Sequence, residues 1–160
     1  MIEIDKVLGN LINLAENKYE LLNEIYLLTE KQAEVIDEAD IKSLTLLIDE
    51  KQSRLDMIRK LDIQFEAITD DIKTLYEVRS LDELEIQNDN LVVLKNSICR
   101  IMGLLENIVE LESCNKDKIN ESKKSLEEKM ENTNTGKKAI KQYGGMASYT
   151  DSFFFDKKIK

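Results

Sequence analysis

Apolar residues recur at intervals of three and four along most of the chain, which is the spacing of helices with one buried side. The first such segment covers about residues 2–37. Its seam positions are Ile4, Leu8, Leu11, Ala15, Leu22, Ile25, Thr29 and Ile36. A second apolar series repeats beside the seam every seven residues: Val7, Leu14, Leu21, Leu28 and Val35. Because this stripe is wider than a two-stranded coiled coil needs, we expect a helix that contacts two neighbours in a bundle.

Two long polar residues, Lys18 and Gln32, fall on the seam of this first helix. Long side chains at such positions either extend to solvent or fix the register between helices. The pattern alone leaves both interpretations open.

A short turn, Glu38-Ala39-Asp40, separates the first segment from the second. Asp40 is a favourable N-cap because its carboxylate can accept hydrogen bonds from the first amides of the next helix. We expect that helix to run from Ile41 to about Val78. Its stripe consists of Ile41, Leu44, Ile48, Leu55, Ile58, Phe65, Ile72 and Tyr76, with Leu61, Ile68 and Leu75 beside it. A turn this short predicts an antiparallel helical hairpin.

The connector after the hairpin contains Ser80 and Glu83, which have the spacing of a capping box. This spacing predicts a short helix over residues 81–86. Asn88 or Asp89 can then cap a third helix. The apolar residues of the connector are expected to cover one end of the hairpin: Leu81, Leu84 and Ile86.

The third periodic segment runs from Asp89 to Glu131 without proline, and as one helix it would be about 60 Å long. Its apolar residues are dense up to Leu111 and become sparse from Glu112 onward. We therefore expect the first part to hold the fold and the second part to be left open for a partner. The sparse stripe consists of Ile119, Leu126 and Met130.

These segments predict an all-α fold, an elongated antiparallel bundle of three long helices plus one short connecting helix and a flexible C-terminal tail. The expected domains are a helical bundle over residues 1–131 and a basic tail that contains aromatic residues over 132–160. The absence of proline, the five glycines and the aromatic content of 6% agree with long helices.

Charge divides the same two regions. Residues 1–131 hold 17 Lys and Arg and 30 Asp and Glu, whereas residues 132–160 hold six Lys and two Asp. An acidic body argues against nucleic-acid binding. The tail is either simply solvated or attracted to an acidic surface, its own body included.

The tail also concentrates aromatic residues, because residues 137–160 contain five of the nine Phe and Tyr. Exposed aromatic side chains are unfavourable unless they pack somewhere. They either fold back onto the bundle or form a docking motif for a partner. The residues are Tyr143, Tyr149, Phe153, Phe154 and Phe155.

The chain offers no constellation for catalysis and no expected cofactor or metal site. It contains no histidine, no phosphate-binding glycine loop and no serine or cysteine with a plausible base. On one helix Cys99 and Cys114 would lie about 22 Å apart, beyond the roughly 7 Å that a disulfide allows. We expect two reduced thiols in a cytoplasmic protein. No uncharged stretch approaches the roughly 20 residues of a membrane span, so no membrane insertion is expected.

Several motifs resemble those of flagellar export chaperones of the FlgN type. The second helix opens with the pattern Asp40-x-x-x-Leu44-x-x-Leu47-x-x-x-Lys51-Gln52. The long last helix carries Asn115 after a leucine-rich run. The tail contains Tyr143-Gly144 and closes on Phe155-Asp156-Lys157-Lys158. The resemblance covers nearly the whole chain.

The resemblance implies a cytoplasmic chaperone without enzymatic activity. Such proteins bind the C-terminal helical segments of hook-associated proteins, prevent their premature association and deliver them to the type III export gate. Client binding would then lie on the late third helix and the tail, at Leu111, Ile119, Leu126, Met130 and Ile140. Docking to the cytoplasmic domain of the export gate would involve Tyr143. The triple phenylalanine departs from the family pattern, so Phe153, Phe154 and Phe155 are candidates for docking to the gate or to another partner.

Two alternatives follow from the residues alone. The chain could be a structural coiled-coil protein that forms homo-oligomers through the same apolar stripe. It could also be an adaptor that displays its aromatic tail to a partner.

Overall fold

A computed structural model of the protein describes residues 3–121. The helices of this part are α1 (Ile4–Asp37), α2 (Ile41–Tyr76), the 3-10 turn η1 (Leu81–Glu83) and α3 (Asp89–Glu121). No strand occurs within it. The expected all-α bundle of three long helices with a short connecting helix is confirmed. The third helix beyond Glu121 and the tail lie outside the described residues, so the domain boundary at residue 131 stays a prediction.

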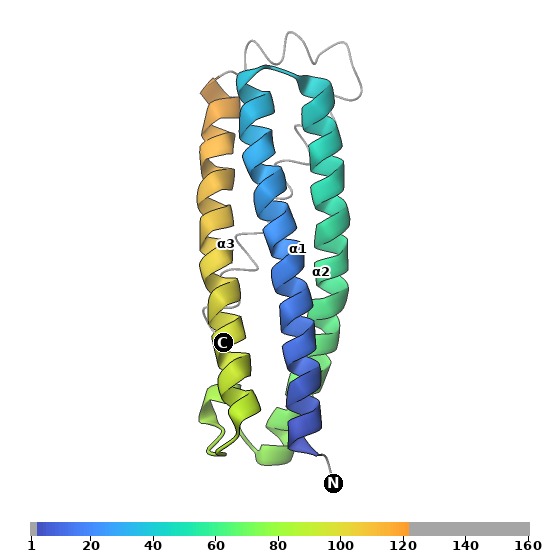
Figure 1. The fold of residues 1–160 in the computed structure, drawn as a ribbon, viewed down its shortest axis with the longest axis vertical. Helices are drawn as coiled ribbons and strands as arrows, with labels where there is room; N and C mark the ends of the chain where they lie inside the picture. Colours follow the sequence, from blue (N-terminus) through green and yellow to red (C-terminus); the bar gives the residue numbers. More distant parts are fainter. Residues whose placement is uncertain (1–2, 122–160) are drawn as a thin grey trace.

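Helix α1 lies between its two neighbours in an elongated, up-down-up arrangement (Figure 1). It packs along its length against both α2 and α3, whereas α2 and α3 approach each other much less closely. Helix α2 runs antiparallel to α1, and α3 runs parallel to it (Figure 1). The wide apolar stripe of the first segment is therefore used as predicted, because α1 has two helices to contact.

One apolar cluster joins the three helices and the connector into a single core. All but one of the expected seam positions of α1 are buried, the exception being the half-buried Ile4 at its start. The deeply buried apolar residues of the other elements are Leu44, Ile48, Leu55, Ile58, Ile72, Leu84, Leu91, Leu94, Ile101, Leu105 and Ile108. Full burial of one such side chain is worth about 1.5–3 kcal/mol, so this cluster is the main source of stability.

The turn between α1 and α2 confirms Asp40 as an N-cap. Its carboxylate accepts from the backbone N–H of Ser43 at 3.1 Å and from the Ser43 hydroxyl at 2.7 Å. Both hydrogen bonds from Ser43 lower the pKa of Asp40, and the one from the side chain has the larger effect. Ala39 takes a left-handed conformation, with φ 55°, which reverses the chain within the turn.

The connector differs in detail from the sequence-based expectation. Its regular part is one 3-10 turn rather than a helix over residues 81–86, and the Ser80 side chain makes no capping bond. Instead the Glu83 carboxylate accepts from the backbone N–H of Arg79 at 2.8 Å, outside the turn. Leu84 then adopts an extended backbone and is buried. The connector therefore covers the end of the hairpin as expected, with Leu84 in the core and Leu81 and Ile86 partly buried against it.

The start of α3 is tied to the start of α1. Asn88 caps α3 by accepting from the backbone N–H of Asn90 at 2.9 Å. Asn88 also donates to the Asp5 carboxylate, and Asn90 donates to the Asp5 carbonyl at 3.3 Å. These contacts fix the parallel alignment of α1 and α3 at one end of the bundle.

Candidate functional site

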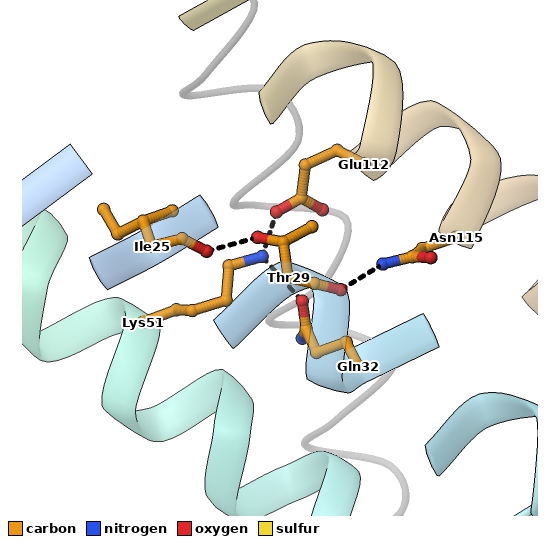
Figure 2. A network of polar contacts seen from close by, with 6 residues as sticks. All are labelled: Ile25, Thr29, Gln32, Lys51, Glu112 and Asn115. Atoms are coloured by element: carbon orange, nitrogen blue, oxygen red, sulfur yellow. Dashed lines mark hydrogen bonds and ion pairs between the residues drawn. The ribbon is translucent and has the colours of Figure 1, made fainter. Parts of the chain in front are cut away.

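A buried polar network connects all three helices at one level of the bundle. Lys51 of α2 and Gln32 of α1 are 0% exposed, and Glu112 of α3 is 4% exposed. The Lys51 ammonium donates to the Gln32 side-chain oxygen at 2.7 Å and forms an ion pair with Glu112. Figure 2 shows these side chains pointing toward one another from three different helices.

The helical spacing explains why these charged residues are inside. Lys51 follows Leu44 by seven residues and precedes Ile58 by seven, so it occupies the apolar stripe of α2. Glu112 likewise follows Ile108 by four residues on the stripe of α3. The sequence carried this signal in the spacing, but charged side chains are usually solvated, and only the facing helix shows that each has a buried partner.

Burial sets the electrostatics of the network. Desolvation lowers the pKa of Lys51, while the charge and the hydrogen bond of Glu112 act in the opposite direction. Because an ammonium group only donates, the side-chain oxygen of Gln32 must face Lys51. The Gln32 amide nitrogen is buried and has no hydrogen-bond partner within the described part of the chain. The network is therefore held by charge pairing, while the Gln32 amide nitrogen stays unsatisfied among residues 3–121.

Polar contacts also hold the last turns of α3. The Asn115 amide donates to the backbone carbonyl of Thr29 at 3.0 Å (Figure 2), and Lys118 pairs with Asp37 at 3.2 Å. Asn115 is only 1% exposed. The expectation that α3 is left open from Glu112 onward is therefore wrong for Glu112 and Asn115, because polar partners on α1 and α2 cover them.

A cleft lies nearer the opposite end of the bundle, where α1 forms the floor and α2 and α3 form the walls. The space within it open to water-sized molecules is about 20 Å³. The salt bridge between Lys18 and Asp62, at 2.6 Å, joins the α1 floor to the α2 wall. The lining residues are Leu14, Ala15, Lys18, Leu61, Asp62, Phe65, Ile98 and Ile101. Lys18 on the seam of α1 is thus buried with a partner instead of extending into solvent.

Partly exposed apolar residues continue from this cleft along both walls. On α2 they share the seven-residue stripe of Leu61, and on α3 they follow Ile98 at helical spacing. The residues on α2 are half-buried, except for one that is 53% exposed, and those on α3 are half-buried. We call this set the cleft rim: Leu47, Leu61, Ile68 and Leu75 on α2, and Ile98, Met102 and Val109 on α3.

Only two of the residues predicted to bind a client lie in the described part of the chain. Ile119 is partly buried and packs against the core. Leu111 is half-buried and lies seven residues before Lys118, which pairs with Asp37 of α1, so its stripe faces α1 and not the cleft. A client role for either stays a prediction. The remaining candidates lie outside the described residues: Leu126, Met130, Ile140, Tyr143, Phe153, Phe154 and Phe155.

Between residues 3 and 121, no group of three or more acidic, cysteine or histidine side chains is placed to hold a metal ion. Cys99 and Cys114 are free and exposed on α3, so they do not pair with each other.

None of the helices α1, α2 and α3 contains a stretch long and apolar enough to cross a bilayer.

Comparison with known proteins gives one match. The family described as FlgN protein matches residues 1–151 of the chain. No curated protein and no solved structure matches significantly.

Proposed function

The chain belongs to the FlgN family of flagellar export chaperones, and on this premise we propose that it binds the C-terminal helices of hook-associated proteins. In this proposal the protein acts in the cytoplasm, keeps these clients from associating before export and brings them to the type III export gate. The observation that carries the client step is the cleft between α2 and α3 with its apolar rim.

The rim has the spacing that an amphipathic helix requires. Leu61, Ile68 and Leu75 repeat every seven residues on α2, and Met102 and Val109 do so on α3. Successive residues within each row lie about 10 Å apart along the helix axis. This spacing matches the i and i+7 anchors of a helix laid in a groove. A client helix in this position would become the fourth member of the bundle and cover the half-buried side chains.

Residues at and beyond the end of α3 supply the remaining contacts in this proposal. Ile119, Leu126, Met130 and Ile140 extend the client surface along the end of α3 and the tail, and Leu111 adds a contact from a side of α3 outside the cleft. Tyr143 docks to the cytoplasmic domain of the export gate, and Phe153–Phe155 dock either to the gate or to the client. A segment that orders on binding gives moderate affinity and allows release, which a delivery step needs.

Introduction of negative charge at the rim tests the client surface. We expect the double variant Leu75→Glu with Met102→Glu to bind the C-terminal helix of a hook-associated protein at least about tenfold more weakly, because a carboxylate would be desolvated under the client. Isothermal titration calorimetry with the helix as a synthetic peptide measures the affinity.

Ile63→Glu with Val93→Glu is the matched control. Ile63 is 69% exposed on α2 and lies about 200° around that helix from Leu61, and Val93 is 44% exposed on α3. The control should bind as the parent does. Equal weakening of the two double variants, or no weakening in either, would remove the cleft from the proposal.

Truncation after Glu131 tests the tail separately. If the shortened chain binds the client as tightly as the full chain, the tail residues have no client role. If it binds the client but no longer binds the export-gate domain, the gate contact is assigned to residues 132–160.

Self-association is the second candidate function, and the exposed apolar residues of the bundle favour it. They are Leu27, Leu46, Met57, Ile63, Leu75, Val92 and Val93. Light scattering at micromolar concentration distinguishes the two. A stable dimer or tetramer without affinity for hook-associated proteins would support a structural coiled-coil protein.

A further inference from the structure

We infer that the Lys51–Gln32–Glu112 network is a clasp that holds α2 against α3 and sets the width of the cleft. Helices α2 and α3 share few close backbone approaches, yet Lys51 and Glu112 join them directly through buried side chains. The inference deepens the proposed function, because it assigns a control element to the proposed client surface.

The clasp and the cleft share the same two helices. On α3 the wall residue Ile101 and the clasp residue Glu112 are separated by about 16 Å of continuous helix. On α2 the clasp residue Lys51 and the wall residue Leu61 likewise belong to one unbroken helix. A change in the spacing of α2 and α3 at the clasp is therefore transmitted to the cleft walls by rigid elements.

The composition of the clasp makes two states accessible. In the closed state Lys51 is desolvated, and its charge is balanced by Glu112. The same state buries the amide nitrogen of Gln32 without a partner in the described part of the chain. Separation of α2 from α3 lets water reach both groups, so the solvation gained offsets the loss of the ion pair. An apolar contact at this place would have no such gain on opening.

A residue that only fixed helix register would behave differently from a clasp. Loss of a register contact lowers stability but leaves the mean separation of α2 and α3 unchanged. Loss of one partner of the clasp leaves a buried charge that is hydrated only when the helices separate. The distance between α2 and α3 is therefore the informative measurement.

The native thiol of Cys114, together with one introduced cysteine, allows this distance to be measured in the full chain. Cys114 is exposed on α3 close to Glu112, and Ser53 is exposed on α2 close to Lys51. The parent protein carries Cys99→Ser and Ser53→Cys, with spin labels at positions 53 and 114, and its distance distribution is recorded by pulsed electron resonance. We expect one narrow distribution for the parent.

Two variants and one control distinguish a clasp from a contact that only fixes helix register. Glu112→Gln should broaden the distribution and shift it to longer distances. Lys51→Met with Glu112→Leu should keep it narrow, because an apolar pair packs without a buried charge. Asp56→Asn removes a partner of an exposed pair, that with Arg59 at 3.2 Å, and should leave the distribution unchanged. A Glu112→Gln distribution identical to the parent, or a double variant as broad as Glu112→Gln, would overturn the clasp.

A client peptide added to the same samples separates the clasp from the proposed function. If the clasp controls the cleft, the Lys51→Met, Glu112→Leu variant should bind the synthetic hook-associated helix about tenfold more weakly than the parent, because its apolar pair gains no hydration on opening and resists the separation of α2 and α3 that admits the helix. This variant is expected to fold, so the test stands even if Glu112→Gln is too unstable. Equal affinity of the parent and this double variant would refute control by the clasp while leaving the chaperone function intact. If the distance distributions differ as expected but neither the parent nor any variant binds the peptide, the proposed function alone is refuted.

Discussion

Three buried residues with formal charge determine how the helices of this bundle fit together. Lys18 pairs with Asp62, and Lys51 pairs with Glu112, each across two helices. An ion pair inside a protein seldom adds net stability, because desolvation cancels most of the attraction, but loss of one partner is costly. These pairs also specify which positions of neighbouring helices face each other.

Removal of Lys51 provides the first prediction. Lys51→Met leaves the Glu112 carboxylate buried without its counterion and should lower the free energy of unfolding by about 3–5 kcal/mol. The double variant Lys51→Met with Glu112→Leu should recover most of this loss. Urea denaturation of the parent, the two single variants and the double variant measures the coupling.

The exposed pair of Arg59 and Asp56 is the control for this cycle. Arg59 is 48% exposed in its side chain, so Arg59→Met should change the free energy of unfolding by less than about 1 kcal/mol. Additive effects of the Lys51 and Glu112 changes would contradict the buried pairing.

The lowered pKa of Lys51 provides the second prediction. Burial lowers this pKa from its ordinary value of 10.5, so the charged form is disfavoured in the folded state. Between the lowered pKa and 10.5 the unfolded chain binds more protons than the folded one, and folding stability must rise with pH in that window. Relative to the Lys51→Met, Glu112→Leu variant, the parent should gain stability as pH rises toward 10. Urea midpoints of both proteins measured from pH 7 to 10 check this, and a constant or falling difference would disagree.

At the same scale, sequence reasoning succeeded where a residue acts locally. Asp40 was predicted as an N-cap from its position alone, since its partners lie three residues away. Lys51, Glu112 and Asn115 lie on predicted stripes, yet their partners are 19 to 86 residues distant. Nothing in the local pattern distinguishes a buried charged residue with a remote partner from a solvated one.

Among the helices, α3 changes its mode of attachment along its length. From Leu91 to Ile108 buried apolar side chains hold it, whereas Glu112 and Asn115 replace them farther on. The expected change of character near residue 111 is therefore real. Its meaning differs from the prediction, because Glu112 and Asn115 are covered through polar contacts instead of being left open.

This change leads to a prediction about hydrogen exchange. Amides of residues 112–121 should exchange through a local opening of lower free energy than amides of residues 91–108, because fewer apolar contacts oppose their release. Asn115→Leu, which removes the hydrogen bond to the Thr29 carbonyl, should accelerate exchange in residues 112–121 and leave residues 91–108 unchanged. Mass spectrometry of peptic fragments reads both segments, and uniform protection along α3 would contradict the division.

For the molecule as a whole, α1 is the element on which the fold depends. It packs against both other helices, and one apolar cluster runs through all three. The breadth of its apolar stripe in the sequence was sufficient to predict two neighbours. The unequal separation, with α2 and α3 farther apart, could not be predicted, because it depends on which side chains meet between them.

A change in the core of α1 should therefore destabilise the molecule in one step. Leu11→Ala removes a side chain that is 0% exposed and should cost about 2–5 kcal/mol, with a single unfolding transition. Leu46→Ala, at a position 59% exposed on α2, should stay within about 0.5 kcal/mol. Circular dichroism and tyrosine fluorescence should give the same urea midpoint for Leu11→Ala. Different midpoints from the two probes would show that the helices unfold independently.

The parallel alignment of α1 and α3 has a mechanical consequence. The start of α1 and the end of α3 lie at opposite ends of the bundle, about 50 Å apart. A pulling force between Ile4 and Glu121 acts along the axis and loads the α1–α3 interface in shear, so that many contacts share the load. A force between Ile4 and Tyr76, which lie at the same end, would peel α2 from α1 one contact at a time. A partner that pulls on the end of α3 therefore applies force in the direction in which the bundle resists unfolding most strongly.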